Sequence, residues 1–310
     1  MPVKKRLRKL FIILLFGLIA FGAGYAPVSG QELEPRTYAN TPVNMNFLAV
    51  GFGHADGNIL FDPSLPIDDL DADTNYAFVR YTRSLGLLGR TAKVKALLPY
   101  AWARWEGRVD GDPGERKDSG LGDAVLGLDV SFMGAPALTA GKFAQYRQKT
   151  IVGSSIRVVA PTGNYDNTKI ANLGSNRWTF RGELGASRQL GKWTLELAGA
   201  LWLYTDNTDF NSGQTLSQAP FYAVKTHVIH TFRPGFWLGF GVGYGEGGRT
   251  KINEVKRDTY QHNWRFGGVL SYPLGQNHGL NFVYVTGIRN GKGSDFDSFA
   301  VAYQYAWGGN

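Results

Sequence analysis

The chain has 310 residues, of which 43% are hydrophobic and 19% are charged, so it is a globular or membrane-embedded protein and not a disordered one. It contains no cysteine, which excludes thiolate catalysis, disulfide bonds and cysteine-ligated metals. The 41 glycines and the 14% aromatic share favour β-structure over helix, because glycine weakens helices and aromatic rings pack well on pleated sheets.

Residues 1–30 have the pattern of a secretory signal peptide. Five basic residues between Lys4 and Lys9 precede an apolar run at 10–19, and small residues before Gln31 predict cleavage after Gly30. An uncleaved anchor is the alternative, although the run is shorter than the roughly 20 residues of a spanning helix. The five charges reduce the net charge of the remaining chain from +8 to +3, since the first 30 residues contain no acid. We therefore expect no nucleic-acid partner.

The rest of the chain alternates between apolar residues and polar or small ones, which is the period of a β-strand. In the clearest segment, Phe236, Leu238 and Phe240 alternate with Trp237 and Gly239. The pattern predicts twelve strands, at 43–53, 74–84, 91–105, 120–132, 149–160, 175–188, 192–205, 219–232, 235–246, 258–272, 278–288 and 296–307. Most of them have ten or more residues, which is longer than the usual ~5–6 of soluble proteins and close to the ~9–11 that cross a bilayer.

The connections between these strands alternate in length. Those at 189–191, 233–234 and 273–277 are tight, whereas 106–118 and 205–217 are long and polar. Short turns at one end and long loops at the other are typical of bacterial outer-membrane barrels, with the long loops outside and both termini in the periplasm. A two-sheet sandwich explains neither this asymmetry nor the strand length.

We therefore predict an all-β fold, a transmembrane antiparallel up-and-down β-barrel of about 12 strands formed by residues 31–310 in the outer membrane. Closure leaves no sheet edge unpaired in lipid. The connection 133–148 is long on the short side, and a periplasmic loop or short helix is expected there. The expected interfacial girdles consist of Tyr100, Trp102, Tyr222, Trp264, Tyr272, Tyr303, Tyr305 and Trp307.

The alternation also predicts which polar side chains point into the lumen. The candidate lumen-lining residues are Arg80, Lys93, Lys95, Asp129, Arg157, Arg177, Arg181, Glu183, Glu196, Lys225, His227 and Arg265. Basic residues outnumber acidic ones in this set. Two interpretations stay open: ion pairs that fill the interior, or a net-basic constriction that favours anionic solutes.

Three further patterns suggest chemistry but fit it poorly. The segment 243–248 matches G-x-G-x-x-G, yet no helical periodicity follows it, so a glycine-rich strand end is expected. Asp69, Asp71 and Asp73 have the spacing of a calcium loop but lack its later glycine and glutamate, which favours an acidic surface loop. His227 has no serine motif nearby in sequence, so neither a catalytic site nor a cofactor or metal is predicted.

Several segments together resemble one known family. They are PTGNYD at 161–166, NLGSNRW at 172–178, GKWTL at 191–195, YTDNTDF at 204–210, TFRPGFW at 231–237, GGRT at 247–250 and DFDS at 295–298. This combination is similar to the "MetA-pathway of phenol degradation" family of outer-membrane proteins. The resemblance implies a porin-like barrel associated with uptake of aromatic or other hydrophobic compounds, and it does not make the chain an enzyme.

The leading hypothesis is a passive outer-membrane channel for small molecules, aromatic or other hydrophobic compounds among them, with a polar, net-basic lumen. A non-conducting structural or surface-interaction barrel is the alternative, and a barrel-type lipid or ester hydrolase ranks third. The expected partners are outer-membrane lipid, a small-molecule solute and the barrel assembly machinery. A plug domain is not expected, because the stretch between Gln31 and the first strand is short.

Overall fold

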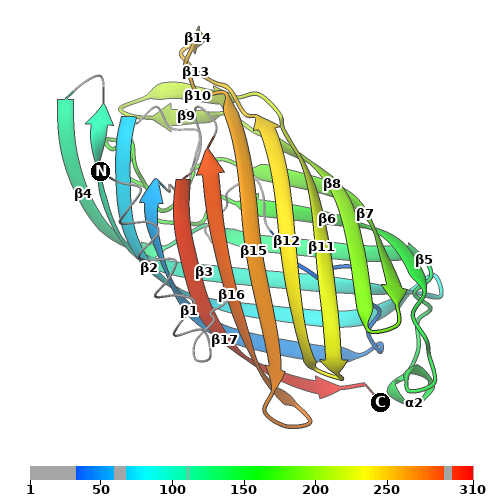
Figure 1. The fold of residues 1–310 in the computed structure, drawn as a ribbon. Coiled ribbons are helices and arrows are strands. Elements are labelled where there is room, and N and C mark those ends of the chain that lie inside the picture. Colours follow the sequence, from blue (N-terminus) through cyan, green and yellow to red (C-terminus); the bar gives the residue numbers. More distant parts are fainter. Residues whose placement is uncertain (1–32, 59–67, 110–111, 290–294, 310) are drawn as a thin grey trace.

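The computed structural model describes residues 33–58, 68–109, 112–289 and 295–309, and it forms a tall barrel of tilted strands (Figure 1). The predicted signal peptide lies outside the described residues. The strands of the barrel wall are β1 (Met45–Asn58), β2 (Asp68–Leu87), β3 (Arg90–Val109), β5 (Ala124–Met133), β6 (Thr150–Ala160), β7 (Thr179–Leu190), β8 (Trp193–Tyr204), β11 (Phe221–Arg233), β12 (Phe236–Gly247), β15 (Gln261–Pro273), β16 (His278–Arg289) and β17 (Asp295–Gly308).

These twelve strands close on themselves. Each pairs antiparallel with the next strand of the wall, and β1 pairs with β17 from Met45 opposite Gly308 to Asn58 opposite Asp295. The predicted fold class and strand count are confirmed. Closure gives the backbone N–H and C=O groups of the wall partners within the protein, which is the condition for spanning lipid with strands.

The predicted strand at 120–132 is wrong in one respect. It corresponds to β5 and includes only the last two residues of a separate strand, β4 (Asp112–Leu121); β4 and β5 pair with the upper and lower halves of β3. The predicted loop at 106–118 therefore belongs largely to a β3–β4 hairpin that extends beyond the barrel (Figure 1). β4 pairs here although it carries charged residues on both faces, because this part of the hairpin lies outside the level at which lipid requires an apolar face.

The two ends of the barrel differ as the sequence predicts. Two-residue turns at 191–192 and 234–235 join strands at one end, where Gly191 and Gly235 take φ angles of 61° and 79° that favour glycine. At the other end a second sheet, in the order β14-β13-β10-β9, rises above the wall (Figure 1). Its strands are β9 (Asn207–Phe210), β10 (Gln214–Gln218), β13 (Thr250–Ile252) and β14 (Val255–Lys256), so the predicted loop at 205–217 is largely a hairpin.

The long connection between β5 and β6 contains the short helix α2 (Ala140–Phe143) and covers the end that carries the tight turns. Its backbone is fixed by hydrogen bonds from the N–H of Val43 to Leu138 O (2.8 Å) and from the N–H of Thr91 to Ala135 O (3.0 Å). The connection is thus a loop with a short helix that packs across the barrel end, and it does not change the strand count.

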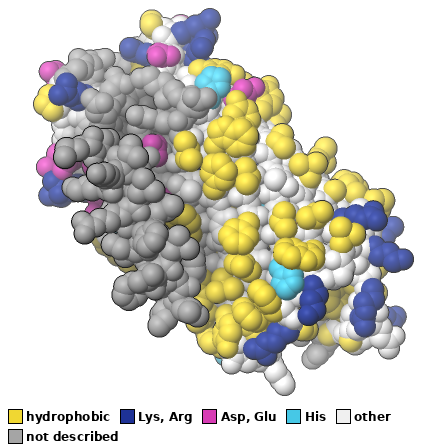
Figure 2. All heavy atoms as spheres, in the orientation of Figure 1, with side chains coloured by type: hydrophobic (Ala, Val, Ile, Leu, Met, Phe, Trp, Pro, Cys, Tyr) yellow, Lys and Arg dark blue, Asp and Glu magenta, His cyan; other side chains and the backbone are white. Residues whose placement is uncertain are grey.

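The outer face of the wall is apolar. Leu184, Leu197 and Phe240 lie in mid-strand with 65%, 59% and 61% of their surface exposed, and Figure 2 shows hydrophobic side chains spread over this face. Exposed large apolar surface of this extent indicates contact with lipid. Of the predicted girdle residues, Tyr100 is half-buried, and the following are exposed: Trp102, Tyr222, Trp264, Tyr272, Tyr303, Tyr305 and Trp307.

Among the described residues, no helix has the length and apolar character needed to cross a membrane. The structure also places the glycine-rich segment 243–248 and the aspartates that have calcium-loop spacing. The G-x-G-x-x-G segment is the end of β12, as expected. Asp71 and Asp73 lie on strand β2 and not in an acidic loop, since the pairing of β2 with β3 extends beyond the predicted strand.

Candidate functional site in the barrel interior

The structure places the sequence-predicted lumen residues on the inner side of the wall. Nine are buried and three are half-buried, while their sequence neighbours face outward. The buried ones are Asp129, Arg157, Arg177, Arg181, Glu183, Glu196, Lys225, His227 and Arg265, and the half-buried ones are Arg80, Lys93 and Lys95. Their role in a solute path stays a prediction.

The N-terminal segment 33–44 lies inside the barrel, which sequence reasoning missed. The carboxylate of Glu34 accepts charge-assisted hydrogen bonds from Arg157 Nη2 at 2.7 Å and Lys95 Nζ at 3.0 Å, and it lies 3.5 Å from Arg80 Nη1. These three cations come from β6, β3 and β2. The chain has no folded plug domain in this segment, but twelve residues suffice to cross the lumen and bind opposite walls.

Further bonds attach the same segment to other strands. The Tyr38 hydroxyl donates to Glu183 Oε1 at 2.7 Å, and the backbone N–H of Arg36 donates to Glu196 Oε2 at 2.8 Å. Lys93 Nζ donates to two carbonyl oxygens of the segment, at 3.0 and 2.8 Å. Every one of these bonds involves a side chain of the segment or of the wall, whereas the wall itself is joined by backbone ladders.

Glycines on the inner face make room for this segment. A Cβ at Gly185 would lie 2.3 Å from the Tyr38 ring, closer than any real contact, and one at Gly153 would lie 3.0 Å from it. Cβ atoms at Gly243 and Gly267 would approach Leu33 to 3.3 and 3.1 Å. The alternate glycines of β12 were the sequence signal for this segment. They put no side chains on the inner face of the wall, so another part of the chain must fill that space.

The basic and acidic side chains form a connected network. Asp129 contacts Lys95 at 2.8 Å and Arg157 at 3.4 Å. Arg157 stands directly opposite Arg181 on the neighbouring strand, a like-charge pair that requires nearby carboxylates. Glu183 supplies one by pairing with Arg181. The ion-pair interpretation therefore describes these residues, and the anion-selective constriction stays a prediction.

His227 belongs to a row that does not form a hydrolytic triad. The strand register sets Ser187 opposite Glu196 and Glu196 opposite His227, and His227 Nδ1 lies 3.8 Å from Glu196 Oε2. In a serine hydrolase the imidazole stands between the hydroxyl and the carboxylate. Here the carboxylate is in the middle, so this row cannot activate the serine in that manner.

The opposite half of the inner face is apolar, which corrects the expectation of a lumen that is polar throughout. The buried residues on this side include Ala55, Ala72, Tyr76, Phe78, Ala101, Ala103, Trp105, Val269, Val283, Val285, Phe296, Ala300 and Ala302. They come mainly from β1–β3 and β15–β17. In these strands the inward-facing positions carry apolar residues, as the outward-facing positions do. The Arg265 guanidinium lies over the Phe296 ring at 5.0 Å, so this arginine meets the apolar side.

The loop 161–178 covers the mouth at the long-loop end and is anchored by Asp123. The Asp123 carboxylate accepts hydrogen bonds from the N–H groups of Gly163 (2.9 Å) and Ser175 (2.8 Å). Within the loop, hydrogen bonds from the Thr168 hydroxyl and N–H lower the pKa of Asp166. Leu173 of this loop belongs to the same apolar cluster as residues of β9, β10 and β13, so the loops close over the apolar half.

Residues 55–305 match the model of the family described as "Putative MetA-pathway of phenol degradation". The chain belongs to this family. It is similar in structure to the COG4313 outer membrane channel from Pseudomonas putida F1, with a TM-score of 0.73 and 23% identity over 89% of this chain and 100% of that one. The family match and this likeness agree with the apolar outer face in making the chain an outer-membrane β-barrel.

Two further solved structures are more distant. The β domain of the Bordetella autotransporter BrkA has 14% identity and a TM-score of 0.48, over 85% of this chain and 100% of that one. The translocator domain of the autotransporter NalP from Neisseria meningitidis has 7% identity and a TM-score of 0.49, over 86% and 90%. Neither bears on function at these scores. No curated protein sequence matches the chain.

Proposed function

We propose that the chain is a passive outer-membrane channel for small molecules, in which the segment 33–44 holds the lumen closed and opens it by moving away. The observation that carries the proposal is how the segment is bound. Residues 34–39 contact the wall through a small number of bonds that involve side chains, whereas neighbouring wall strands share continuous backbone ladders; the backbone bond of the segment to a wall strand lies at its end, from the N–H of Asn44 to Ser84 O. Displacement of the segment therefore leaves the barrel intact.

Hydrogen-bond energies indicate that the segment separates from the wall more easily than the wall strands separate from one another. The hydrogen bonds that join residues 34–39 to the wall strands through Glu34, Glu183, Glu196 and Lys93 each involve a charged group, and each contributes about 1.5–3 kcal/mol. A wall strand cannot leave the sheet at a similar cost, because each backbone N–H or C=O group that lost its partner in lipid would cost several kcal/mol. The segment thus opens at a lower cost than any wall strand, and local opening of this kind is where gating motions originate.

The two halves of the lumen suit a solute that is both polar and apolar. One side offers basic groups from β2, β3, β6, β7 and β11, and the other offers aromatic and aliphatic side chains. The similar Pseudomonas protein is an outer membrane channel, and the name of the family refers to phenol degradation. We propose small amphiphilic molecules as the solutes, translocated by diffusion and without chemical change.

A liposome swelling assay tests this proposal. We expect proteoliposomes that contain the variant lacking residues 31–38 to swell in an isosmotic small sugar several-fold faster than those with the wild type. The shortened chain keeps Asn40 and Val43, which bond to the connection below the barrel. If neither protein speeds swelling although both are folded, the non-conducting structural barrel is the better account.

A further inference from the structure

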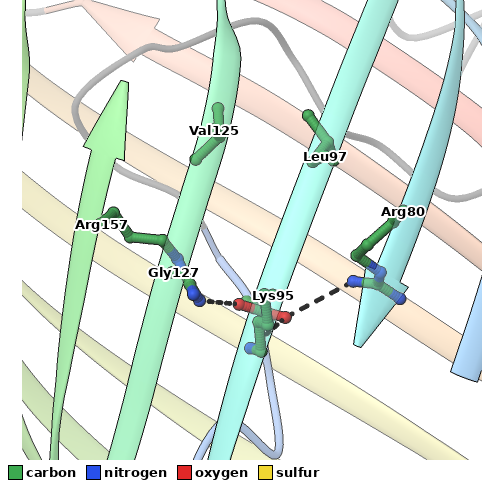
Figure 3. A pocket seen from close by; sticks show the side chains of 7 residues that line it. Arg80, Lys95, Leu97, Val125, Gly127 and Arg157 are labelled. Carbon is green, nitrogen blue, oxygen red and sulfur yellow. Dashed lines mark hydrogen bonds and ion pairs between the residues drawn. The ribbon is translucent and has the colours of Figure 1, made fainter. Parts of the chain in front are cut away.

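A pocket in the polar half of the lumen contains three cations and an apolar rim. With Glu34 in place its cavity volume is only about 30 Å³, and it is lined by Glu34, Arg80, Lys95, Leu97, Val125, Gly127 and Arg157. Figure 3 shows Arg157 and Arg80 on either side of Lys95, with Leu97 and Val125 together on one side of the charged groups. Four strands and the N-terminal segment contribute to it.

The three cations converge on one carboxylate, that of Glu34. The side chains of Arg80, Lys95 and Arg157 are only 18%, 12% and 7% exposed, so they need counter-charges inside the protein. Glu34 and Asp129 provide two. When the segment moves out, the pocket loses the Glu34 carboxylate while Asp129 still pairs with Lys95 and Arg157, and the pocket then favours another anion.

The shape of the pocket fixes the orientation of a ligand. Gly127 stands opposite Arg157, and a Cβ there would lie 2.3 Å from Arg157 Nη1, so the missing side chain lets the guanidinium lie against the wall. Leu97 and Val125 face each other across β3 and β5, two residues from Lys95 and Gly127 toward the long-loop end. A ligand thus meets charge at one end and aliphatic side chains at the other.

We propose that this pocket binds a small organic carboxylate with an apolar body, and that Glu34 is an internal carboxylate that the ligand displaces. The proposal rests on the proposed function in taking the segment to be removable. The ligand carboxylate takes the place of the Glu34 carboxylate at Arg157 and Lys95, and its apolar body lies against Leu97 and Val125. Ligand binding and release of the segment are then coupled, because both carboxylates compete for the same cations.

Glu34 belongs to the same chain as the pocket, and this determines how tightly a free ligand should bind. A group on the same chain competes at a high effective concentration, of the order of millimolar or above. Free ligand therefore binds weakly to the wild type. Replacement of Glu34 by the neutral, nearly isosteric glutamine removes the competing charge but keeps the volume of the side chain.

The test is calorimetric titration of the purified full-length protein in detergent with benzoate, and with neutral benzamide as its isosteric control. We expect Glu34→Gln to bind benzoate at least tenfold more tightly than the wild type and to bind benzamide no better. In that background, Arg157→Gln should weaken benzoate binding at least tenfold and Arg80→Gln somewhat less. Arg265→Gln is the matched control, a buried lumen arginine on the apolar side, and should have little effect.

Three results would overturn the proposal: equal binding of benzoate and benzamide, no gain with Glu34→Gln, or an equal loss with Arg265→Gln. Heat-modifiable migration on a gel identifies variants that do not fold, and Arg80→Gln offers a milder change if Arg157→Gln is one of them. Binding in detergent does not require passage through the barrel. Benzoate binding without liposome swelling would thus reject only the proposed function, and swelling without benzoate binding would reject only this site.

Discussion

Substitution of Tyr38 by phenylalanine should loosen the N-terminal segment without disturbing its packing. The ring stays against the space left by Gly153 and Gly185, and only the hydroxyl that donates to Glu183 at 2.7 Å is lost. Glu183 keeps Arg181 and Lys225 as partners, so it is not left without a counter-charge. The loss is then that of one hydrogen bond to a charged group.

Such a bond is worth about 1.5–3 kcal/mol. Taking about 2 kcal/mol, the ratio of released to docked segment rises about 30-fold, since about 1.4 kcal/mol corresponds to a factor of ten. The chain contains no cysteine, so a single Thr37→Cys substitution gives a unique thiol at a position that is 5% exposed in the docked state.

The rate of maleimide labelling at this thiol measures the released population when opening is fast relative to labelling. We expect Tyr38→Phe to raise the rate about 30-fold. Tyr76→Phe is the matched control, because Tyr76 is another buried lumen tyrosine whose hydroxyl bonds to Ser298 (3.0 Å) away from the segment. An unchanged rate in Tyr38→Phe, or an equal rise in Tyr76→Phe, would refute the reasoning.

Three further predictions concern the wall and its glycines. Gly185→Leu should expel the Tyr38 ring and raise single-channel conductance, whereas Gly199→Leu, where a Cβ has no neighbour within 4 Å, should not. Glu183→Gln should lower the free energy of unfolding in micelles by about 3–5 kcal/mol, because Arg181 and Lys225 stay buried without their carboxylate; a shift within error would contradict the network. Leu184→Arg at mid-strand on the lipid face should cost about 2–4 kcal/mol of folding free energy in bilayers, and Leu190→Arg at the strand end about 0–1 kcal/mol; equal costs would argue against the assigned membrane position.

The wall of the barrel could be predicted from the sequence because lipid imposes a strict rule on it. Each spanning strand must present apolar residues at every second position, as Leu195 and Leu197 do around Glu196. The rule loses its force outside the bilayer. The β3–β4 hairpin carries charged residues on both faces there, so its pairing leaves no periodic signal.

The occupied lumen could not be predicted in the same way. Glu34 binds Arg157, 123 residues away, and no local pattern encodes a contact between an irregular segment and a distant strand. The alternation of the strand predicted that Arg157 points inward, but it did not predict that Glu34 is its partner. The apolar half was missed for a related reason, since inward Phe78, Val283 and Val285 follow the same alternation as outward residues and periodicity alone does not distinguish the two faces.

The central claim, that the segment closes a conducting barrel, is tested most directly by single-channel recording in planar bilayers. The variant lacking residues 31–38 should conduct continuously, and a synthetic peptide of residues 31–44 added on the side of the tight turns should block it, whereas a peptide with Glu34 and Tyr38 replaced by alanine should block it far less. A folded variant without conductance, or with a conductance that the native peptide does not reduce, would contradict the account.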